Sequence, residues 1–210
     1  AHGVGFNTTA TIMYGHIEQY EHVARHLLRV RALQEKTGGF TEFVILPFIH
    51  MEAPIYLKGN ARKGPTFREA VLIHAIARLT LNPVFKNIQA SWTKLGHEGV
   101  KACLNAGVND IGGTLMNETI TRAAGAAHGQ ETSPEEMEAL IRSAGRNPRQ
   151  RATNYGAVSE VQRQKSFGAS VLTEPSYTAA KRYDRDKTKK APLVRPGLIS
   201  EETLSSADII

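Results

Sequence analysis

The sequence predicts an α/β fold, namely one half of a parallel (β/α) barrel of the TIM type. Four short, apolar, β-branched segments begin near residues 8, 43, 87 and 108, and each is followed by a segment with helical spacing. Strand–helix repetition of this kind implies a parallel sheet with right-handed crossovers. Polar residues follow the carboxyl ends of the strands, and four such units are half of the number in a complete barrel.

The first unit begins with a strand that is bounded by glycines. Thr8 to Tyr14 (TTATIMY) is β-branched and apolar, and Gly15 follows it, which predicts a buried strand. Residues 18–36 carry apolar side chains at helical spacing. The Thr37-Gly38-Gly39 segment is typical of a helix end.

The second unit contains a strand, a long loop and a capped helix. Residues 43–48 (FVILPF) predict a second buried strand, and residues 49–65 form a loop rich in glycine and proline. Thr66 is the predicted N-cap of a helix that runs to Leu81. Glu69, three residues after the cap, completes a capping box.

The remaining elements are shorter. Residues 87–92 (NIQASW) predict a third strand, followed by a helix over residues 96–106. Residues 108–112 (VNDIG) predict a short fourth strand, followed by a helix over residues 114–125. Pro134, which follows a serine, occupies the first position of one more predicted helix.

Two ways of arranging the parallel sheet are open, a doubly wound sheet and a barrel. The short buried strands and the polar residues at their carboxyl ends favour the half barrel, which we expect to comprise residues 1–157. Residues 158–210 mix charged residues, serine and proline, and predict an irregular or disordered tail. Because the sequence opens in mid-pattern, we expect it to be part of a longer protein.

The single cysteine, Cys103, excludes several classes of function for the chain alone. One thiol forms no intrachain disulfide, and it cannot hold a zinc ion or an iron–sulfur cluster, which take about four ligands. We therefore expect no metal ligands in this chain. No apolar run approaches the ~20 residues of a membrane span, and no secretory signal is visible. These observations predict a cytoplasmic or organelle-stromal protein that is not secreted.

The charge is weakly positive and evenly distributed. Lys and Arg number 26 against 20 Asp and Glu, which gives a net charge of +6. Nucleic-acid binding favours a concentrated basic patch, so we expect no nucleic-acid partner. The GRNPRQR segment at residues 145–151 holds three arginines, which suit carboxylate or phosphate, but a solvated basic turn explains it more simply.

The turn after the first strand contains candidate catalytic residues. His16 and Glu18 lie two residues apart in a strand-to-helix loop, where an imidazole and a carboxylate can orient a polar substrate or move a proton. Tyr14, at the strand end, is a candidate substrate contact. Alternatively, Glu18 only complements the dipole at the start of the following helix.

The third strand supplies two further candidate substrate contacts, Gln89 and Ser91. Side chains alternate along a strand, so these two point one way while Ile88 and Ala90 point the other way. In a barrel, one of these sets faces the lumen and can bind a ligand. The alternative is a polar layer whose hydrogen bonds are satisfied within the barrel.

The most distinctive local feature is the NDIGGT segment at residues 109–114. Gly112 and Gly113 let the backbone approach a ligand closely, and a helix that begins after Thr114 offers free N–H groups to an anion. Asp110 can accept a hydrogen bond from a ribose hydroxyl or an amine, and Asn109 is a candidate substrate contact. The alternative is a tight turn in which Thr114 caps the helix.

Five segments, taken in this order, resemble one enzyme family. They are TTATIMYGHIE, HLLRVRALQEKTGGFTEFVILPF, NIQASWTKLG, NDIGGT and GRNPRQRATNY. Over residues 5–156 the sequence resembles the C-terminal half of the tyrosine-using component of FO synthase, a radical S-adenosylmethionine enzyme of deazaflavin coenzyme biosynthesis. Enzymes of the futalosine route to menaquinone share much of TGGF, QASW and NDIGGT.

The resemblance implies a radical-SAM barrel in which a 4Fe-4S cluster and S-adenosylmethionine generate a radical. The radical cleaves the Cα–Cβ bond of L-tyrosine, and the 4-hydroxybenzyl group is joined to 5-amino-6-(D-ribitylamino)uracil. A ring-closing component, fused or separate, then completes the deazaflavin. The cluster loop, with three cysteines, is absent here, so we expect it upstream of Ala1 and expect this chain alone to be inactive.

The resemblance also suggests a role for each candidate residue. His16 and Glu18 are the expected catalytic groups. The expected substrate contacts are Tyr14, Gln89, Ser91 and Asn109, and the expected contacts to S-adenosylmethionine are Asp110, Gly112, Gly113 and Thr114.

Three other interpretations remain open. Within the same chemistry, aminofutalosine synthase or the related cyclase acts on different substrates. In another class, a non-catalytic module binds RNA through its basic residues and predicts salt-dependent binding. The third interpretation is a structural remnant that only pairs with another half barrel.

Overall fold

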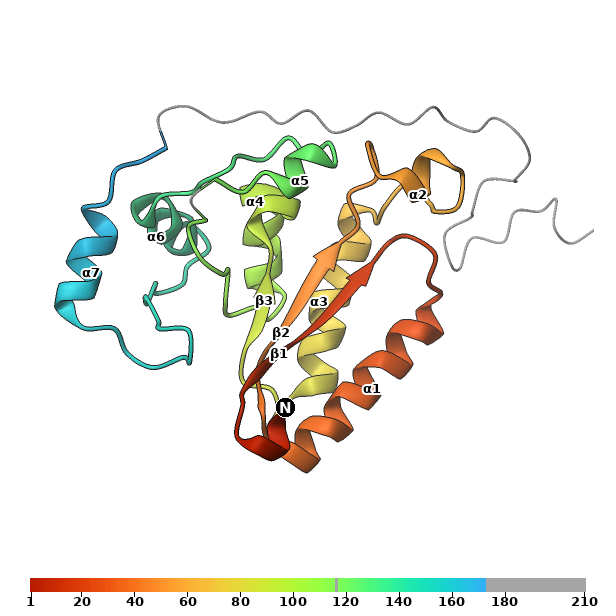
Figure 1. The fold of residues 1–210 in the computed structure, drawn as a ribbon, viewed down its shortest axis with the longest axis horizontal. Helices are drawn as coiled ribbons and strands as arrows, with labels where there is room; N and C mark the ends of the chain where they lie inside the picture. The colour runs from red at the N-terminus through yellow and green to blue at the C-terminus, as the bar shows by residue number, and fades with distance from the viewer. Residues whose placement is uncertain (116, 173–210) are drawn as a thin grey trace, which may run out of the picture.

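The computed structural model describes residues 1–115 and 117–172, which form a small parallel sheet covered by helices (Figure 1). The three strands are β1 (Thr8–Tyr14), β2 (Phe40–Pro47) and β3 (Ile88–Ala90), in the order β1-β2-β3. The longer helices are α1 (Tyr20–Thr37), α3 (Phe67–Leu81), α4 (Trp92–Asn105) and α6 (Pro134–Ser143). The shorter ones are η1 (His2–Val4), α2 (Pro54–Leu57), α5 (Ile120–Ala123) and α7 (Glu160–Phe167).

One face of the sheet packs on α1, α3 and α4 and forms the core. Its strand residues are Ala10, Ile12, Tyr14, Phe43, Ile45, Ile88 and Ala90. They meet Leu27 of α1, Ile73 of α3 and Val100 of α4. Because side chains alternate along a strand, the intervening residues lie on the opposite face. We call this opposite side the open face; it carries Thr9, Thr11, Met13, Glu42, Val44, Leu46 and Gln89.

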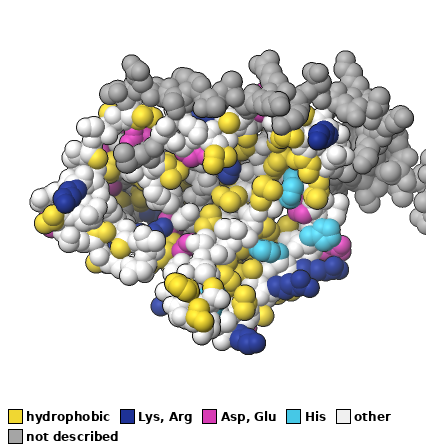
Figure 2. Space-filling model, in the orientation of Figure 1, with side chains coloured by type: hydrophobic (Ala, Val, Ile, Leu, Met, Phe, Trp, Pro, Cys, Tyr) yellow, Lys and Arg dark blue, Asp and Glu magenta, His cyan; other side chains and the backbone are white. Residues whose placement is uncertain are grey.

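The open face is visible in the space-filling view. Hydrophobic side chains lie over the central strands there, with charged side chains around them (Figure 2). Thr9, Thr11 and Met13 of β1 are exposed on this side. The β1 side of this face is therefore available to a ligand or to a further part of a longer protein, whereas Glu42 and Val44 of β2 are buried.

A β-bulge in β2 decides which residues reach the open face. Thr8 pairs with Phe40 and Ala10 pairs with Phe43, so two residues of β2 oppose the single residue Thr9. Phe40 and Phe43 are three residues apart and would face opposite sides of a regular strand. Because of the extra residue, both rings pack against Phe85, at centroid distances of 5.6 and 6.1 Å.

The starts of α3 and α6 and the end of α1 agree with the prediction, whereas α4 begins four residues before the predicted start, at Trp92. Thr66 caps α3 and Glu69 returns the hydrogen bond, as the capping box predicted. Ser133 and Glu136 form the same arrangement at α6, with Pro134 at the first helical position. Gly38, in the left-handed conformation with φ 63°, ends α1.

The predicted fourth strand and the helix after it were wrong in extent. Residues 108–112 contribute only an isolated parallel bridge between Asp110 and Gln89. The amide of Ile88 donates to the side chain of Asn109 instead of to a backbone carbonyl, and Gly112 at φ 74° ends the extended backbone. The predicted helix 114–125 is reduced to α5, because Leu115 and Asn117 have positive φ and break the helical path.

Besides the short η1 before β1, two helices were not predicted. α2 lies within the predicted loop 49–65 and begins at Pro54. α7 lies within the predicted tail, where Ser159 caps it. Residues 173–210 of that tail lie outside the described residues.

The α/β class with a parallel sheet is confirmed, whereas the sheet of the described residues is open and does not close into a barrel. β1 forms one edge of this sheet. In the described ranges, no helix has the length and apolar character needed to cross a membrane.

The contact of Phe85 with both phenylalanines of β2 makes it the most informative position for a stability test. We predict that Phe85→Ala lowers the free energy of unfolding by about 3–5 kcal/mol, because a buried ring is replaced by a cavity. Leu79→Ala, at an α3 position that is 78% exposed, should change it by less than about 0.5 kcal/mol. Urea unfolding of the purified chain measures both, and equal effects would contradict the packing described here.

Candidate functional site

A histidine–carboxylate pair lies at the carboxyl end of β1. Glu18 accepts hydrogen bonds from the backbone amides of Gly15 at 2.6 Å and His16 at 3.0 Å. The Glu18 oxygen that accepts from the His16 amide also accepts a hydrogen bond from Nδ1 of His16, at 2.8 Å. The carboxylate thus fixes the imidazole ring and leaves Nε2 as the nitrogen that can exchange a proton.

A buried arginine ties this pair to the neighbouring loop and helix. The Arg62 side chain is only 5% exposed and donates to Glu18 at 3.3 Å. It also contacts Glu69 at 3.2 Å and donates to the carbonyl of Gly64 at 3.0 Å. Because Glu69 belongs to the capping box of α3, Arg62 connects the turn after β1 to the start of that helix.

Both carboxylates of this cluster stay ionised at neutral pH. Burial raises the pKa of Glu18, but the amides of Gly15 and His16 and the His16 side chain outweigh burial and hold that pKa below its usual value. Burial likewise raises the pKa of Glu69, while the Thr66 amide and the Arg62 charge lower it overall. An ionised Glu18 can therefore keep accepting from His16, as an orienting partner of a general acid–base residue must.

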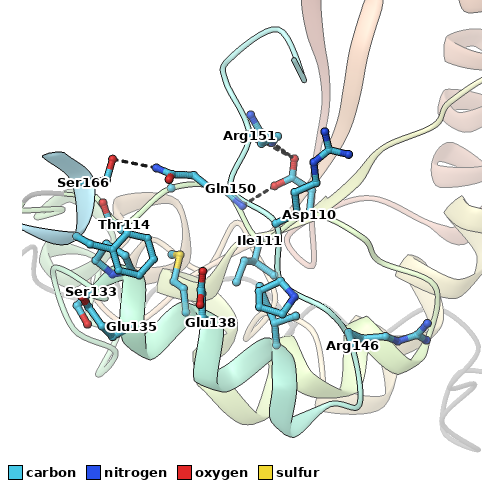
Figure 3. Close-up of a pocket in the computed structure, with 18 of the residues that line it drawn as sticks. Asp110, Ile111, Thr114, Ser133, Glu135, Glu138, Arg146, Gln150, Arg151 and Ser166 are labelled. Carbon is cyan, nitrogen blue, oxygen red and sulfur yellow. Dashed lines mark hydrogen bonds and ion pairs between the residues drawn. The ribbon is translucent and has the colours of Figure 1, made fainter. Parts of the chain in front are cut away.

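A second cluster is centred on Asp110, beside β3 (Figure 3). One oxygen of Asp110 accepts from the amide of Gly112 at 2.8 Å. The other forms an ion pair with Arg151 at 2.6 Å and accepts a hydrogen bond from the hydroxyl of Tyr155. The guanidinium of Arg151 also lies 4.0 Å from the centroid of the Tyr155 ring.

Tyr155 is held as a proton donor in this cluster. Burial and the hydrogen bond to Asp110 raise the pKa of its phenol, so the hydroxyl stays protonated. Its backbone has φ 65°, which is uncommon for a residue other than glycine. Both oxygens of Asp110 are thus occupied by donors of this chain, and the carboxylate positions the Gly112 turn.

A pocket of about 1190 Å³ adjoins this cluster. It lies between residues 108–114, α6, residues 146–151 and the end of α7 (Figure 3). Charged residues of both signs line it, namely Asp110, Glu131, Glu135, Glu138, Arg146, Arg149 and Arg151. Most of these already have partners. Glu138 pairs with Arg142 and Arg163, and Arg151 pairs with Asp110. Glu131 accepts a hydrogen bond from the amide of Leu172, and Arg146 donates one to the carbonyl of Leu104.

The structure brings several of the predicted site residues together. His16 and Glu18 are in contact, and Gln89 forms a bridge with Asp110 next to Gly112. A Cβ atom placed on Gly112 would lie 3.5 Å from the side-chain oxygen of Gln89. Space around Gly113 is open, since a Cβ atom placed there would meet no atom within 4 Å.

Other predicted residues lie elsewhere or have structural partners. Tyr14 points into the helix-covered core, is 3% exposed, and its hydroxyl has no partner there. Asn109 bonds Arg78, Ile88 and Lys86, all within the protein. Ser91 contacts Thr93 at the start of α4. Thr114 does not cap a helix, because the next one, α5, begins at Ile120, and the Thr114 carbonyl accepts from the amide of Thr132.

Sequence reasoning missed Arg62, Arg151, Tyr155 and Glu42. The three arginines of residues 145–151 were a visible signal, although a solvated turn explained them more simply, and Arg151 in fact pairs with Asp110. Arg62 and Tyr155 lie in loops with no spacing pattern, so their partners become apparent only in three dimensions. Glu42 lies in β2, where the bulge decides its direction.

Cys103 lies in the core of the molecule. It is fully buried in α4, and burial raises the pKa of its thiol to about 12. Within residues 1–115 and 117–172, no three His, Cys, Asp or Glu side chains are grouped so that they could hold a metal ion.

Comparison with known proteins identifies the family. Residues 37–164 match the family model described as the CofH/MqnC C-terminal region. This chain belongs to that family. The matched stretch contains β2, the bulge at Glu42 and the entire Asp110 cluster.

Curated relatives carry the names of two related enzymes. A 5-amino-6-(D-ribitylamino)uracil–L-tyrosine 4-hydroxyphenyl transferase of Methanopyrus kandleri is 52% identical over 75% of this chain and 43% of its own length. A transferase of the same name from Methanothermobacter thermautotrophicus is 50% identical over 77% of this chain and 44% of its own length. An FO synthase of Streptomyces avermitilis is 48% identical over 81% of this chain and 20% of its own length. The chain thus spans less than half of each relative.

The lowered pKa of Glu18 predicts how its contribution to stability depends on pH. An acid whose pKa is depressed by folding stabilises the native state above its unfolded pKa, which is about 4.3 for Glu, and loses this effect as the pH falls through its folded value. Glu18→Gln should therefore destabilise the chain at pH 7 and progressively less below about pH 4.

The same measurement needs a matched control. Glu98→Gln, at an exposed position of α4, should leave the unfolding free energy nearly unchanged from pH 7 to pH 3. A Glu18→Gln penalty that stays constant over this range would show that the ionised carboxylate is not what stabilises the turn.

Proposed function

We propose that this chain forms the C-terminal part of a 4-hydroxyphenyl transferase of FO synthesis. In that reaction the 4-hydroxybenzyl group of L-tyrosine is joined to 5-amino-6-(D-ribitylamino)uracil. The proposal is supported by a sequence identity of 52% and 50% to two transferases that are named for these two substrates. The enzymes of the futalosine route are not favoured, because the relatives named above all belong to FO synthesis.

In the longer protein, residues 1–157 act as the C-terminal half of a radical-SAM (β/α) barrel. Two features support this assignment. β1 is an edge strand that can pair with a preceding strand, and the open face is free to line a lumen. The histidine–carboxylate pair follows the carboxyl end of β1, which is where barrel enzymes hold their reacting groups. Residues 158–210 follow the half barrel in this proposal, and α7 contacts α6 through the pair of Arg163 with Glu138.

The chain's own residues do not fit an iron–sulfur cluster. The one thiol is buried and strongly favours its protonated form, so cluster ligands belong to another part of the longer protein. S-adenosylmethionine and the cluster, when bound, supply the radical that starts the reaction. In this chain the exposed Gly113 backbone and Thr114 are the positions that suit S-adenosylmethionine, with Asp110 holding the Gly112 turn in place.

The roles of the remaining residues follow from their contacts. His16 holds or moves a proton through Nε2, and Glu18 orients its ring. Gln89 and Ser91 are substrate contacts on or near the open face. Tyr14 and Asn109 support the site from within the protein, since Tyr14 is in the core and Asn109 joins three backbone and side-chain partners.

Partners and location follow from the same proposal. The product passes to a ring-closing component that is either fused to the longer protein or separate from it. The reaction takes place in the cytoplasm or an organelle stroma, and no nucleic acid takes part.

Burial of the only thiol leads to a prediction about metal content. Anaerobic treatment of the isolated chain with iron and sulfide should give no stoichiometric 4Fe-4S absorbance, because Cys103 is shielded and its thiol pKa is about 12. Maleimide labelling should be slow in the folded chain and complete in urea. A stable cluster formed on this chain alone would contradict the proposal that the cluster ligands belong to another part of the longer protein.

The proposed role of His16 predicts a kinetic effect in the full-length enzyme. His16→Gln should reduce tyrosine-dependent product formation by about 100-fold or more while leaving the cluster absorbance unchanged. His97→Gln, at an exposed position of α4, should retain normal turnover. Near-normal turnover of both His16→Gln and Glu18→Gln would mean that this pair only stabilises the turn.

A further inference from the structure

Glu42 is a buried carboxylate on the open face of the sheet. It lies in β2 at the bulge opposite Thr9, and it is 8% exposed. Phe43, its neighbour, points to the helices, so Glu42 points to the other side. None of the contacts that assemble the His16 pair or the Asp110 cluster uses this side chain.

Glu42 has very few partners for a buried charge. The hydroxyl of Thr9 donates to one of its oxygens. In the described part of the chain, no lysine, arginine or histidine lies within ion-pair distance of it. The hydroxyl of Tyr155, which is close enough for its pKa to be affected by Glu42, donates to Asp110 instead. A buried carboxylate needs several hydrogen-bond donors, and the described residues of this chain supply one.

The surroundings of Glu42 divide the open face into two zones. Thr9 lies beside Glu42, and Thr11 and Gln89 are the polar neighbours of Val44, one step further along the strands. Met13 and Leu46 make the zone toward the carboxyl ends of the strands apolar. Strands rise about 3.3 Å per residue, so Glu42 lies roughly 13 Å below Leu46 along β2. A ligand on this face would meet hydroxyl and carboxylate groups at one end and hydrocarbon at the other.

We propose that Glu42 binds the hydroxyl groups of the ribityl chain of the aminouracil substrate, with Thr9 orienting the carboxylate. This inference rests on the proposed function and adds a subsite to it. A polyol chain supplies neighbouring O–H donors, which a carboxylate with free lone pairs accepts, and charge-assisted bonds of this kind are strong. The apolar zone suits the phenol ring of tyrosine. Glu42 is thus a residue that determines specificity for a hydroxylated side chain.

The test compares two acceptor substrates in the full-length enzyme. One is 5-amino-6-(D-ribitylamino)uracil, and the other carries an ethylamino group in place of the ribitylamino group. Glu42→Gln keeps the size of the side chain and removes its charge. It should lower kcat/KM for the ribityl substrate by about 10- to 100-fold and leave kcat/KM for the ethyl analogue unchanged. The KM for tyrosine should stay the same.

Further variants separate binding from folding. Thr9→Val removes the hydroxyl that orients Glu42 and should cause a smaller loss confined to the ribityl substrate. Glu35→Gln, on the exposed side of α1, should change neither substrate. Calorimetric binding of the ribityl substrate to Glu42→Gln should weaken by the same factor as kcat/KM, and an unchanged thermal midpoint would show that the variant is folded.

The outcomes distinguish this inference from the proposed function. Unchanged kcat/KM for the ribityl substrate, an equal loss with both acceptors, or a raised KM for tyrosine would each overturn the assignment of Glu42. If the wild-type full-length enzyme makes no product from tyrosine and the aminouracil, the proposed function itself fails.

Discussion

Phe85 packs against both Phe40 and Phe43, and this contact decides how β2 presents the rest of its residues. Two aromatic side chains three positions apart can share one face only if the strand carries an extra residue. The bulge that results keeps both rings in the core and directs Glu42 to the open face. The large free energy of burying the rings thus keeps a carboxylate at a position where it is poorly paired.

In the loops, too, contacts between distant residues fix where charged side chains lie, and the two charged clusters show this. Arg62 is almost completely buried, and it is stable there because Glu18, Glu69 and a backbone carbonyl surround it. Asp110 is held in the same way by Arg151, Tyr155 and the amide of Gly112. Each cluster joins segments that are far apart in the sequence, so each fixes a loop whose own residues have little regular structure. Preorganised loops of this kind are what a substrate site requires.

The clusters differ in what they leave available to a ligand. At the end of β1, the imidazole of His16 keeps one nitrogen free. Beside β3, both oxygens of Asp110 already accept hydrogen bonds within the chain. The space beside Gly113 is open, although its carbonyl accepts from the indole of Trp92. Among the described candidate residues, Glu42 has the most unused hydrogen-bonding capacity, because its carboxylate accepts only from Thr9. It lies on the open face and was not suspected from the sequence.

The sequence by itself determined the elements whose signals are local. β1 was predicted at its observed bounds from β-branched apolar residues between glycines, and the start of α3 was predicted from Thr66 and Glu69. The contact of His16 with Glu18 follows from their spacing in one turn. Tertiary structure decided the rest. The predicted fourth strand is only a bridge, because the amide of Ile88 donates to the side chain of Asn109 instead of to a backbone carbonyl. The side chain of Tyr14 lies in the core. The partners of Arg62, Asp110 and Glu42 depend on which chain segments pack together, and no local pattern encodes contacts between residues more than 30 positions apart.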